Sequence, residues 1–130
     1  MISLPPVSEI TQLEASLCFA LADSVRILML YALDEQPRNV SELSALLTLS
    51  QPSTSRHLKV LRERGLVSAD RQGVNIIYRL TDHRLIEALD VLRNVLHDQI
   101  AHQASLLEEI TGEHAPLDAP ENTASVEENL

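Results

Sequence analysis

The chain has 130 residues, of which 45% are hydrophobic, so it fits one domain with a packed core and room for a tail. Its single cysteine, Cys18, excludes an internal disulfide framework and a CxxC zinc site. No apolar run approaches the ~18 residues that a membrane span needs, and the first residues do not resemble a signal peptide, so a cytoplasmic protein is expected.

The net charge of -9 conceals a basic middle segment. Residues 38–79 hold seven bases and three acids. Each of the other segments, residues 1–37, 80–107 and 108–130, carries a net negative charge. Phosphate attraction is felt within about a Debye length, roughly 10 Å at ordinary salt. The local charge therefore favours a nucleic-acid partner, although the total charge argues against one.

Helical spacing of apolar residues predicts a first amphipathic helix over residues 8–21. Asp23 is expected to cap a second helix. The apolar stripe of this second helix is predicted to be Val25, Leu28, Met29, Ala32 and Leu33. After a break at residues 36–39, Ser41 is expected to cap a short helix, whose inward residues are Leu43, Leu46 and Leu47.

A further helix is predicted from Ser50, as its cap, to about Arg64, with Gly65 ending it. Residues 66–70 and 74–80 then read as two strands around the turn Arg71-Gln72-Gly73. The alternation of Val74, Ile76 and Tyr78 supports the second strand. The expected fold class is thus mainly α with a small β-hairpin, in the order α-α-α-α-β-β-α.

Thr81 is expected to cap a long last helix that runs to about Thr111, roughly 45 Å for thirty residues. Its apolar stripe is longer than a domain of this size can cover, so part of it is expected to meet another subunit. The domain is predicted to span 8–111, between an N-terminal extension (1–7) and an acidic tail (112–130) expected to be disordered.

A short helix, a tight connection and a helix that opens in small polar residues are typical of a helix-turn-helix. In the segment LSQPSTSRHL, Thr54 and Leu58 are predicted to face inward together with Leu61. The residues then left to face a DNA major groove are Gln51, Ser53, Ser55, Arg56 and Lys59. Gln51 suits adenine, and Arg56 suits guanine or a phosphate. The hairpin would be a wing, with Arg71 for the minor groove and Asn75 for phosphate or sugar.

The runs ALADSVRILMLYAL, SELSALLTLSQPSTSRHLKVLRERGLV and RQGVNIIYRL resemble the ArsR/SmtB family of winged-helix repressors, over roughly residues 10–105. The resemblance implies a homodimer held by the first and last helices. It also implies a double-stranded DNA operator with dyad symmetry, released when an inducer binds. The alternative is a winged-helix module that binds protein and not DNA, favoured by the net charge of -9. An enzyme is not expected, because no Gly-rich phosphate loop, GxSxG or HExxH occurs.

The family's sensor sites suggest where an inducer would bind. The short helix before the turn has no cysteine, which argues against a thiolate arsenic site there. A site between paired last helices would use Asp82 with the partner's Asp98 and His102 to bind Zn²⁺ or Ni²⁺, although Arg84 replaces a family histidine. The alternative is that Asp82 stabilises the helix N-terminus and the histidines are surface residues.

Three further features have open roles. Cys18 is expected to be a small buried hydrophobe near the dimer contact, with a redox or thiol switch between subunits as the alternative. His57 is interpreted as a packing or hydrogen-bonding residue. Arg62 and Arg64 are interpreted as a solvated face with Glu63.

Overall fold

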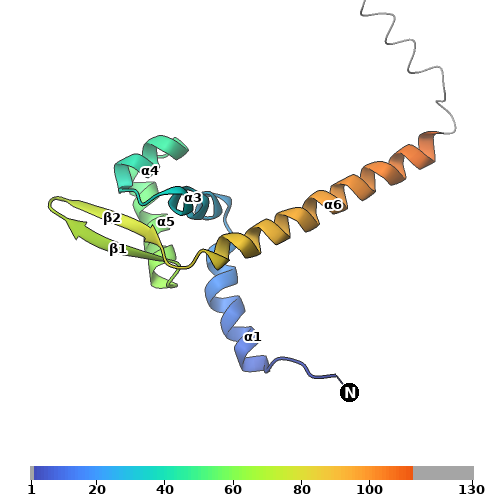
Figure 1. The fold of residues 1–130 in the computed structure, drawn as a ribbon, viewed down its shortest axis with the longest axis horizontal. Helices are drawn as coiled ribbons and strands as arrows, with labels where there is room; N and C mark the ends of the chain where they lie inside the picture. The colour runs from blue at the N-terminus through green and yellow to red at the C-terminus, as the bar shows by residue number, and fades with distance from the viewer. Residues whose placement is uncertain (1, 113–130) are drawn as a thin grey trace, which may run out of the picture. The chain divides into compact units, whose positions relative to one another are not determined.

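The computed structural model describes residues 2–112, and the predicted tail therefore lies almost entirely outside the described part of the chain. The described residues fall into two compact units that divide between Glu87 and Ala88. The order of elements is helical up to residue 63, then a hairpin, then a long helix (Figure 1). This confirms the predicted fold class.

The first helical segment has a π-helical turn in its middle. It consists of α1 (Val7–Leu13), the π-helical turn η1 (Glu14–Cys18) and α2 (Phe19–Leu21). Asp23 then caps α3 (Ser24–Glu35) as predicted, because its carboxylate accepts from the backbone N–H groups of Val25 and Arg26 at 2.8 and 3.2 Å. The N–H groups of the first helical turn have no partner within the helix, so this cap supplies one.

The helix α3 lies at the centre of the first unit and packs against α2, α4, α5 and β2. Its buried residues are Met29, Leu30, Ala32 and Leu33. The predicted stripe was wrong at Leu28, which is 53% exposed, and it omitted Leu30, which is fully buried. A helix contacted by several elements buries more than one narrow stripe, so a single periodic face did not identify its core.

The short helix α4 (Val40–Leu47) begins two residues before the predicted start. Asn39 caps it: the Asn39 side chain accepts from the Glu42 N–H, and the Glu42 carboxylate accepts from the Asn39 N–H, both at 2.8 Å. This reciprocal capping box satisfies both backbone N–H groups. Leu43 is buried as predicted, but Leu46 is 52% exposed and Ser44 is buried in its place.

The helix α5 (Gln51–Glu63) begins at its predicted cap, Ser50, whose hydroxyl accepts from the Ser53 N–H. It ends at the predicted place, where Gly65 takes a φ of +77°. Glycine reaches this left-handed conformation without the steric cost that a Cβ brings.

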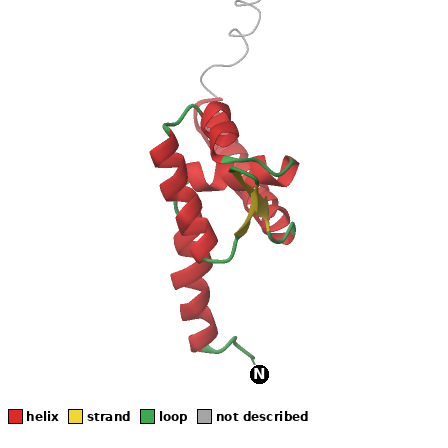
Figure 2. Ribbon diagram, turned by 90° about the vertical axis from the view of Figure 1, so that its left-hand side faces the viewer, coloured by secondary structure: helices red, strands yellow, loops and turns green. Residues whose placement is uncertain are grey.

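The hairpin pairs β1 (Val67–Gln72) with β2 (Asn75–Leu80) in antiparallel register. The predicted turn was placed too early: Gly73 and Val74 form it, and Gln72 pairs with Asn75 inside the ladder. Gly73 has a φ of +65°, as two-residue hairpin turns require. Helix fills the other described elements, apart from an isolated bridge between Arg38 and Tyr78 (Figure 2).

The last helix, α6, spans Arg84–Gly112 and starts later than predicted. Thr81 does not cap it: the Thr81 hydroxyl donates to the Gly65 carbonyl at 2.8 Å, and its N–H donates to Leu66 O. Thr81 thus closes the base of the hairpin. Beyond residue 88 the helix exposes a series of large apolar side chains: Val91, Leu92, Val95, Leu96, Ile100, Leu106, Leu107 and Ile110.

None of the described helices is by itself long and apolar enough to cross a membrane, although Val7–Leu21 and Ser24–Glu35 meet that test together as a pair bent by 83°.

Candidate nucleic-acid interface

A three-residue connection joins α4 to α5. Thr48 takes the left-handed conformation, with φ 56° and ψ 54°, and the Leu49 N–H donates to Ser44 O at 2.9 Å. This bond closes the end of α4, and Ser50 then caps α5. The chain therefore reverses within the connection, and the two helices pack against each other.

Hydrogen bonds between buried hydroxyl groups connect the two helices. The Ser44 hydroxyl donates to Thr54 Oγ1 at 2.9 Å, and the Thr54 hydroxyl donates to Ser50 O at 2.9 Å. Thr54 is fully buried and Ser44 is 7% exposed. Since both side chains have partners, the polar atoms do not destabilise the interior. The chain of bonds fixes how α5 is rotated against α4.

Three buried side chains on α5 determine which face of the helix is exposed to solvent. Thr54, Leu58 and Leu61 are fully buried, as predicted. The residues predicted to read DNA lie on the rest of the helix: Gln51, Ser55, Arg56 and Lys59 are exposed, and Ser53 is half-buried. Small hydroxyl side chains beside long basic ones allow the helix backbone to come close to a partner surface.

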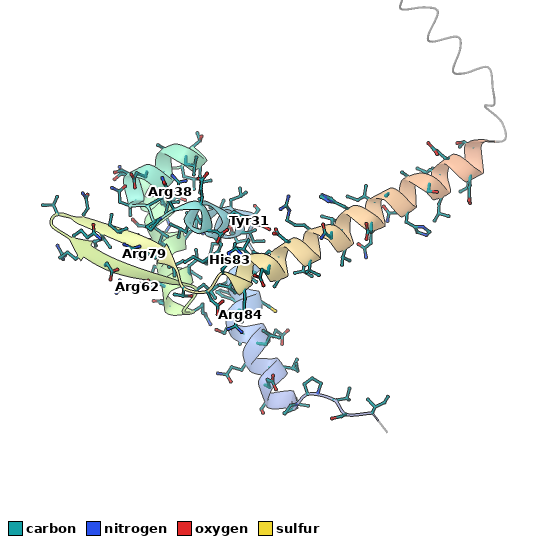
Figure 3. The ribbon with its side chains drawn as sticks, viewed as in Figure 1. Tyr31, Arg38, Arg62, Arg79, His83 and Arg84 are labelled. Atoms are coloured by element: carbon teal, nitrogen blue, oxygen red, sulfur yellow. The ribbon has the colours of Figure 1, made fainter. Side chains whose placement is uncertain are left out.

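The exposed cations in the middle of α5 are not neutralised by any acidic side chain of residues 2–112. Within that range, no ion pair engages Arg56, Lys59 or Arg71, whereas Arg79 pairs with Asp70 at 3.4 Å. Figure 3 labels Arg62 near the end of α5 and Arg79 on the hairpin. An unpaired surface cation attracts an anion without first breaking a local ion pair, so this side of the first unit suits a phosphate-bearing partner.

The wing carries its two predicted contact residues within its strands and not at its tip. Arg71 lies in β1 opposite Ile76, and Asn75 lies in β2 opposite Gln72. Both are exposed. The tip itself is apolar, because Val74 is 95% exposed. An apolar tip between polar strand residues was not foreseen from the alternating pattern.

The end of α5 is tied to the first helical segment, which sequence reasoning missed. Arg64 donates to Ala15 O at 2.7 Å, and its guanidinium lies 4.7 Å from the Phe19 ring centroid. Arg64 is therefore not simply part of a solvated face. The contact spans 49 positions of sequence, and no local pattern reveals such a pairing.

Arg26 of α3 also contacts the first helical segment. Its guanidinium donates to Ala20 O at 2.7 Å and to Phe19 O at 3.1 Å, and it lies 3.4 Å from His57 Nδ1. The prediction that His57 is a hydrogen-bonding residue is confirmed. The backbone carbonyls of the first helical segment thus hold one arginine from α3 and another from the end of α5.

Of the predicted metal ligands, Asp98 and His102 are exposed, whereas Asp82 is half-buried and already engaged by a neighbouring side chain. Arg84 donates to both carboxylate oxygens of Asp82, at 2.7 to 3.2 Å. The side-chain and backbone hydrogen bonds from Arg84 lower the pKa of Asp82 to about 2. Asp98 and His102 lie one turn apart on α6, and the part of one chain that is described holds no group of three His, Cys, Asp or Glu side chains fit for a metal ion. A metal bound by Asp82 would share the carboxylate oxygens with Arg84 or compete with it for them.

Cys18 closes the π-helical turn, and in this single chain it is exposed, not buried as expected. The apolar stripe beside it belongs to the same helical segment, in which Leu13 and Phe19 are also partly exposed. The expected burial of Cys18 is therefore wrong for one chain. The redox role stays a prediction.

The short helix, the left-handed turn, the exposed second helix and the hairpin define a winged helix-turn-helix protein. Comparison with known proteins narrows this class. Residues 23–69 match the family described as bacterial regulatory protein, arsR family. The transcriptional repressor SmtB of Mycobacterium tuberculosis H37Rv is 39% identical over 98 residues, which cover 75% of this chain and 67% of the relative. The chain belongs to the arsR family of bacterial regulatory proteins, which confirms the resemblance found in its sequence.

Solved structures agree on the fold. The crystal structure of M. tuberculosis Rv0081 aligns with a TM-score of 0.66 at 33% identity, over 78% of this chain and 99% of that one. The homodimeric winged helix-turn-helix DNA-binding domain of Mb0332 from Mycobacterium bovis aligns with a TM-score of 0.65, over 78% of this chain and 95% of that one. Its identity of 23% shows the fold alone.

Proposed function

We propose that this protein is a homodimeric transcriptional repressor that binds an operator of double-stranded DNA and is not an enzyme. The observation that carries the proposal is the outward face of α5. Three fully buried residues hold the helix in place, and its exposed residues combine hydroxyls, an amide and cations that form no ion pair within residues 2–112. The relatives support it, since SmtB is named a transcriptional repressor.

The proposed contacts divide by chemistry. Gln51, Ser53 and Ser55 meet base edges, because hydroxyl and amide groups match the hydrogen-bonding atoms of the major groove. Arg56 meets guanine or a phosphate, and Lys59 meets a phosphate. On the wing, Arg71 enters the minor groove and Asn75 contacts phosphate or sugar.

The dimer is supported by apolar surface that a single chain leaves uncovered. The exposed apolar residues of α6 recur beyond residue 88, where Leu92 is 61% and Leu96 is 52% exposed. The first helical segment also exposes apolar side chains, with Ile10 at 44% and Phe19 at 49%. Burying a fully exposed side chain of this kind is favourable by about 1.5–3 kcal/mol, and the half-exposed side chains here would each gain about half of that. Pairing of both segments with a second copy would therefore stabilise the fold.

The inducer is proposed to be a metal ion, a thiol-reactive or redox signal, or another small ligand. The proposed metal set remains Asp82 with the partner's Asp98 and His102, for Zn²⁺ or Ni²⁺, and the proposed redox residue remains Cys18. Elemental analysis of the purified protein, with DNA-release titrations using Zn²⁺, Ni²⁺, arsenite and an oxidant, separates these signals.

The function is tested by selecting duplexes from a random pool with the purified full chain. The proposal expects enrichment of a sequence with dyad symmetry, bound by two chains per duplex in sedimentation measurements. No enrichment, together with no duplex binding at low salt, would favour a module that binds protein.

A further inference from the structure

Two arginines join the first helical segment to the part of the first unit that carries α5. Arg64, which follows α5, donates from Nη1 to Ala15 O at 2.7 Å. Arg26, in the first turn of α3, donates from Nε to Ala20 O at 2.7 Å and from Nη2 to Phe19 O at 3.1 Å. A guanidinium group only donates hydrogen bonds and a backbone carbonyl only accepts them. The direction of all three bonds is therefore unambiguous.

The carbonyl group that Arg64 binds is made available by the π-helical turn. In an α-helix the N–H of Phe19 would donate to Ala15 O, four residues earlier. In η1 this N–H donates to Glu14 O and Ser16 O. Ala15 O is therefore released from its α-helical donor, and Arg64 takes the place of that donor. Single π-helical turns inside helices are frequent at functional sites, so the turn has a role that a regular helix could not fill.

The bonds from both arginines bridge the bend between the first helical segment and α3. The segment Val7–Leu21 and the helix α3 meet at a bend of 83°. At this bend Ala22 leaves helical geometry, with a ψ of 42°. The short helix α2 packs on α3 beside the bend, and Arg26 and Arg64 add bonds to the segment from α3 and from the end of α5. The direction of the first helical segment relative to α5 is thus held by packing and by two arginines.

A change of this direction would move the end of α5 that is proposed to read DNA. The helix α5 has 13 residues and is therefore about 20 Å long. Arg64 holds its C-terminal end, whereas Gln51 begins it. A tilt of about 10° at one end of such a helix displaces the other end by about 3.5 Å, which is close to the rise of one base pair, about 3.4 Å. In the proposed dimer the first helical segments of two chains meet, so this direction also determines how far apart the two α5 helices lie.

We propose that Arg26 and Arg64 are positioning residues that hold the two α5 helices of the dimer at the separation of the two half-sites. This inference rests on the proposed homodimeric DNA-binding function. Neither arginine has to touch DNA in this role. When one α5 has bound its half-site, the other is already placed for the second half-site and loses little further orientational freedom. An operator with two half-sites is therefore preferred strongly over a single half-site.

The test measures how much of the affinity depends on the second half-site. The Kd of the wild type and of Arg64→Ala is measured on the duplex selected from a random pool and on a duplex that keeps one half-site. Both proteins are used at concentrations at which sedimentation shows dimers. Arg64→Ala is expected to lower the ratio of the half-site Kd to the operator Kd by about five- to tenfold, because each subunit loses a bond from a charged donor.

The matched control is Arg62→Ala, which removes an equal charge from the same end of α5. Arg62 is exposed, and the ratio of the two Kd values is expected to stay unchanged in this variant. A partly unfolded sample would weaken binding to both duplexes by the same factor. The ratio therefore responds to positioning and not to a loss of stability.

A second measurement follows the geometry of the dimer without DNA. Spin labels are attached at Ser68→Cys, an exposed position of β1, in a chain that also carries Cys18→Ser. Double electron–electron resonance then gives the distribution of distances between the two labels of a dimer. We expect a narrow distribution, which becomes broader when Arg64→Ala is added.

Two outcomes would overturn the inference while leaving DNA binding intact. One is a ratio of Kd values that Arg64→Ala leaves unchanged, including an equal loss of affinity on both duplexes. The other is a distribution of label distances that Arg64→Ala does not broaden. A wild type that binds no duplex, or that stays monomeric, would overturn the proposed function and this inference together.

Discussion

Replacing Arg56 distinguishes a contact with a base from a contact with a phosphate. It is exposed near the middle of α5, and no ion pair holds it within residues 2–112. We expect Arg56→Ala to weaken binding to the selected duplex by about 1–3 kcal/mol and to relax the preference at one base pair, as removal of a guanine contact would.

The control for Arg56→Ala is Arg93→Ala, which removes the same charge from α6. The Kd values of both variants are measured on the selected duplex and on its single base-pair replacements. If Arg56→Ala weakens binding equally on every sequence, Arg56 contacts a phosphate and its assignment to a base edge is wrong.

The buried hydroxyls of Ser44 and Thr54 give a stability prediction. Thr54→Val keeps the shape of the side chain but leaves the Ser44 hydroxyl without its acceptor, so we expect a loss of about 1–3 kcal/mol in the free energy of unfolding. The double variant Ser44→Ala, Thr54→Val removes both partners and is expected to recover part of that loss. Urea unfolding of Ser44→Ala, Thr54→Val and the double variant measures this, and strictly additive losses would contradict the coupling.

Residues could be assigned from sequence where one periodic rule applied. Thr54, Leu58 and Leu61 follow the helical repeat and are fully buried, and Asp23 and Ser50 cap the helices that they precede. The rule failed at Leu46, which the repeat placed inward and which is 52% exposed. Only the arrangement of neighbouring elements decides which of two adjacent apolar residues is covered.

At the scale of elements, the contact of Arg64 with the first helical segment gives a second stability prediction. Arg64→Ala removes the bond to Ala15 O and the contact with the Phe19 ring. We expect a loss of about 1–2 kcal/mol in unfolding free energy. The neighbouring variant Arg62→Ala is the control, and it is expected to stay within about 0.5 kcal/mol, as is usual for exposed surface positions. Equal melting temperatures for the two variants would show that the tie adds no stability.

The start of α6 predicts a dependence of stability on acidity. The pKa of Asp82 is about 2 in the folded chain, below its ordinary value of 3.8, because Arg84 donates to its carboxylate. A group with a lowered folded pKa stabilises the fold above its unfolded pKa, and this contribution disappears as the pH falls through the folded pKa. Melting temperatures of the wild type and Asp82→Asn should therefore differ above about pH 4 and converge toward about pH 2. A difference that stays constant over this range would contradict the pairing.

The ends of helices and strands are predicted well where a capping residue or a glycine marks them. They are predicted poorly where contacts with distant residues determine where the element begins. Gly65 ends α5 as expected, since its φ of +77° suits glycine. The residue type predicts Thr81 as a helix cap, yet its hydroxyl closes the base of the hairpin by donating to Gly65 O. The partner lies 16 residues away, and a local cap rule does not register it.

At the scale of the whole molecule, charge distribution matters more than net charge. The chain carries -9 in total, yet residues 38–79 hold four more bases than acids, from seven bases and three acids. This segment includes α5 and most of the wing. The charges of the separate segments predict this basic region. Only the structure shows that Arg56 and Lys59 are exposed and that they form no ion pair within residues 2–112.

The salt dependence of duplex binding tests most directly whether the basic face of α5 docks on DNA. The Kd of the full chain for the selected duplex is measured from about 50 to about 200 mM salt, beside Lys59→Ala. We predict that the wild-type affinity falls by orders of magnitude and that Lys59→Ala lowers the slope of log K against log salt by about 1 for each phosphate that Lys59 neutralises. An affinity that does not change with salt, or a slope that Lys59→Ala leaves unaltered, would contradict the account.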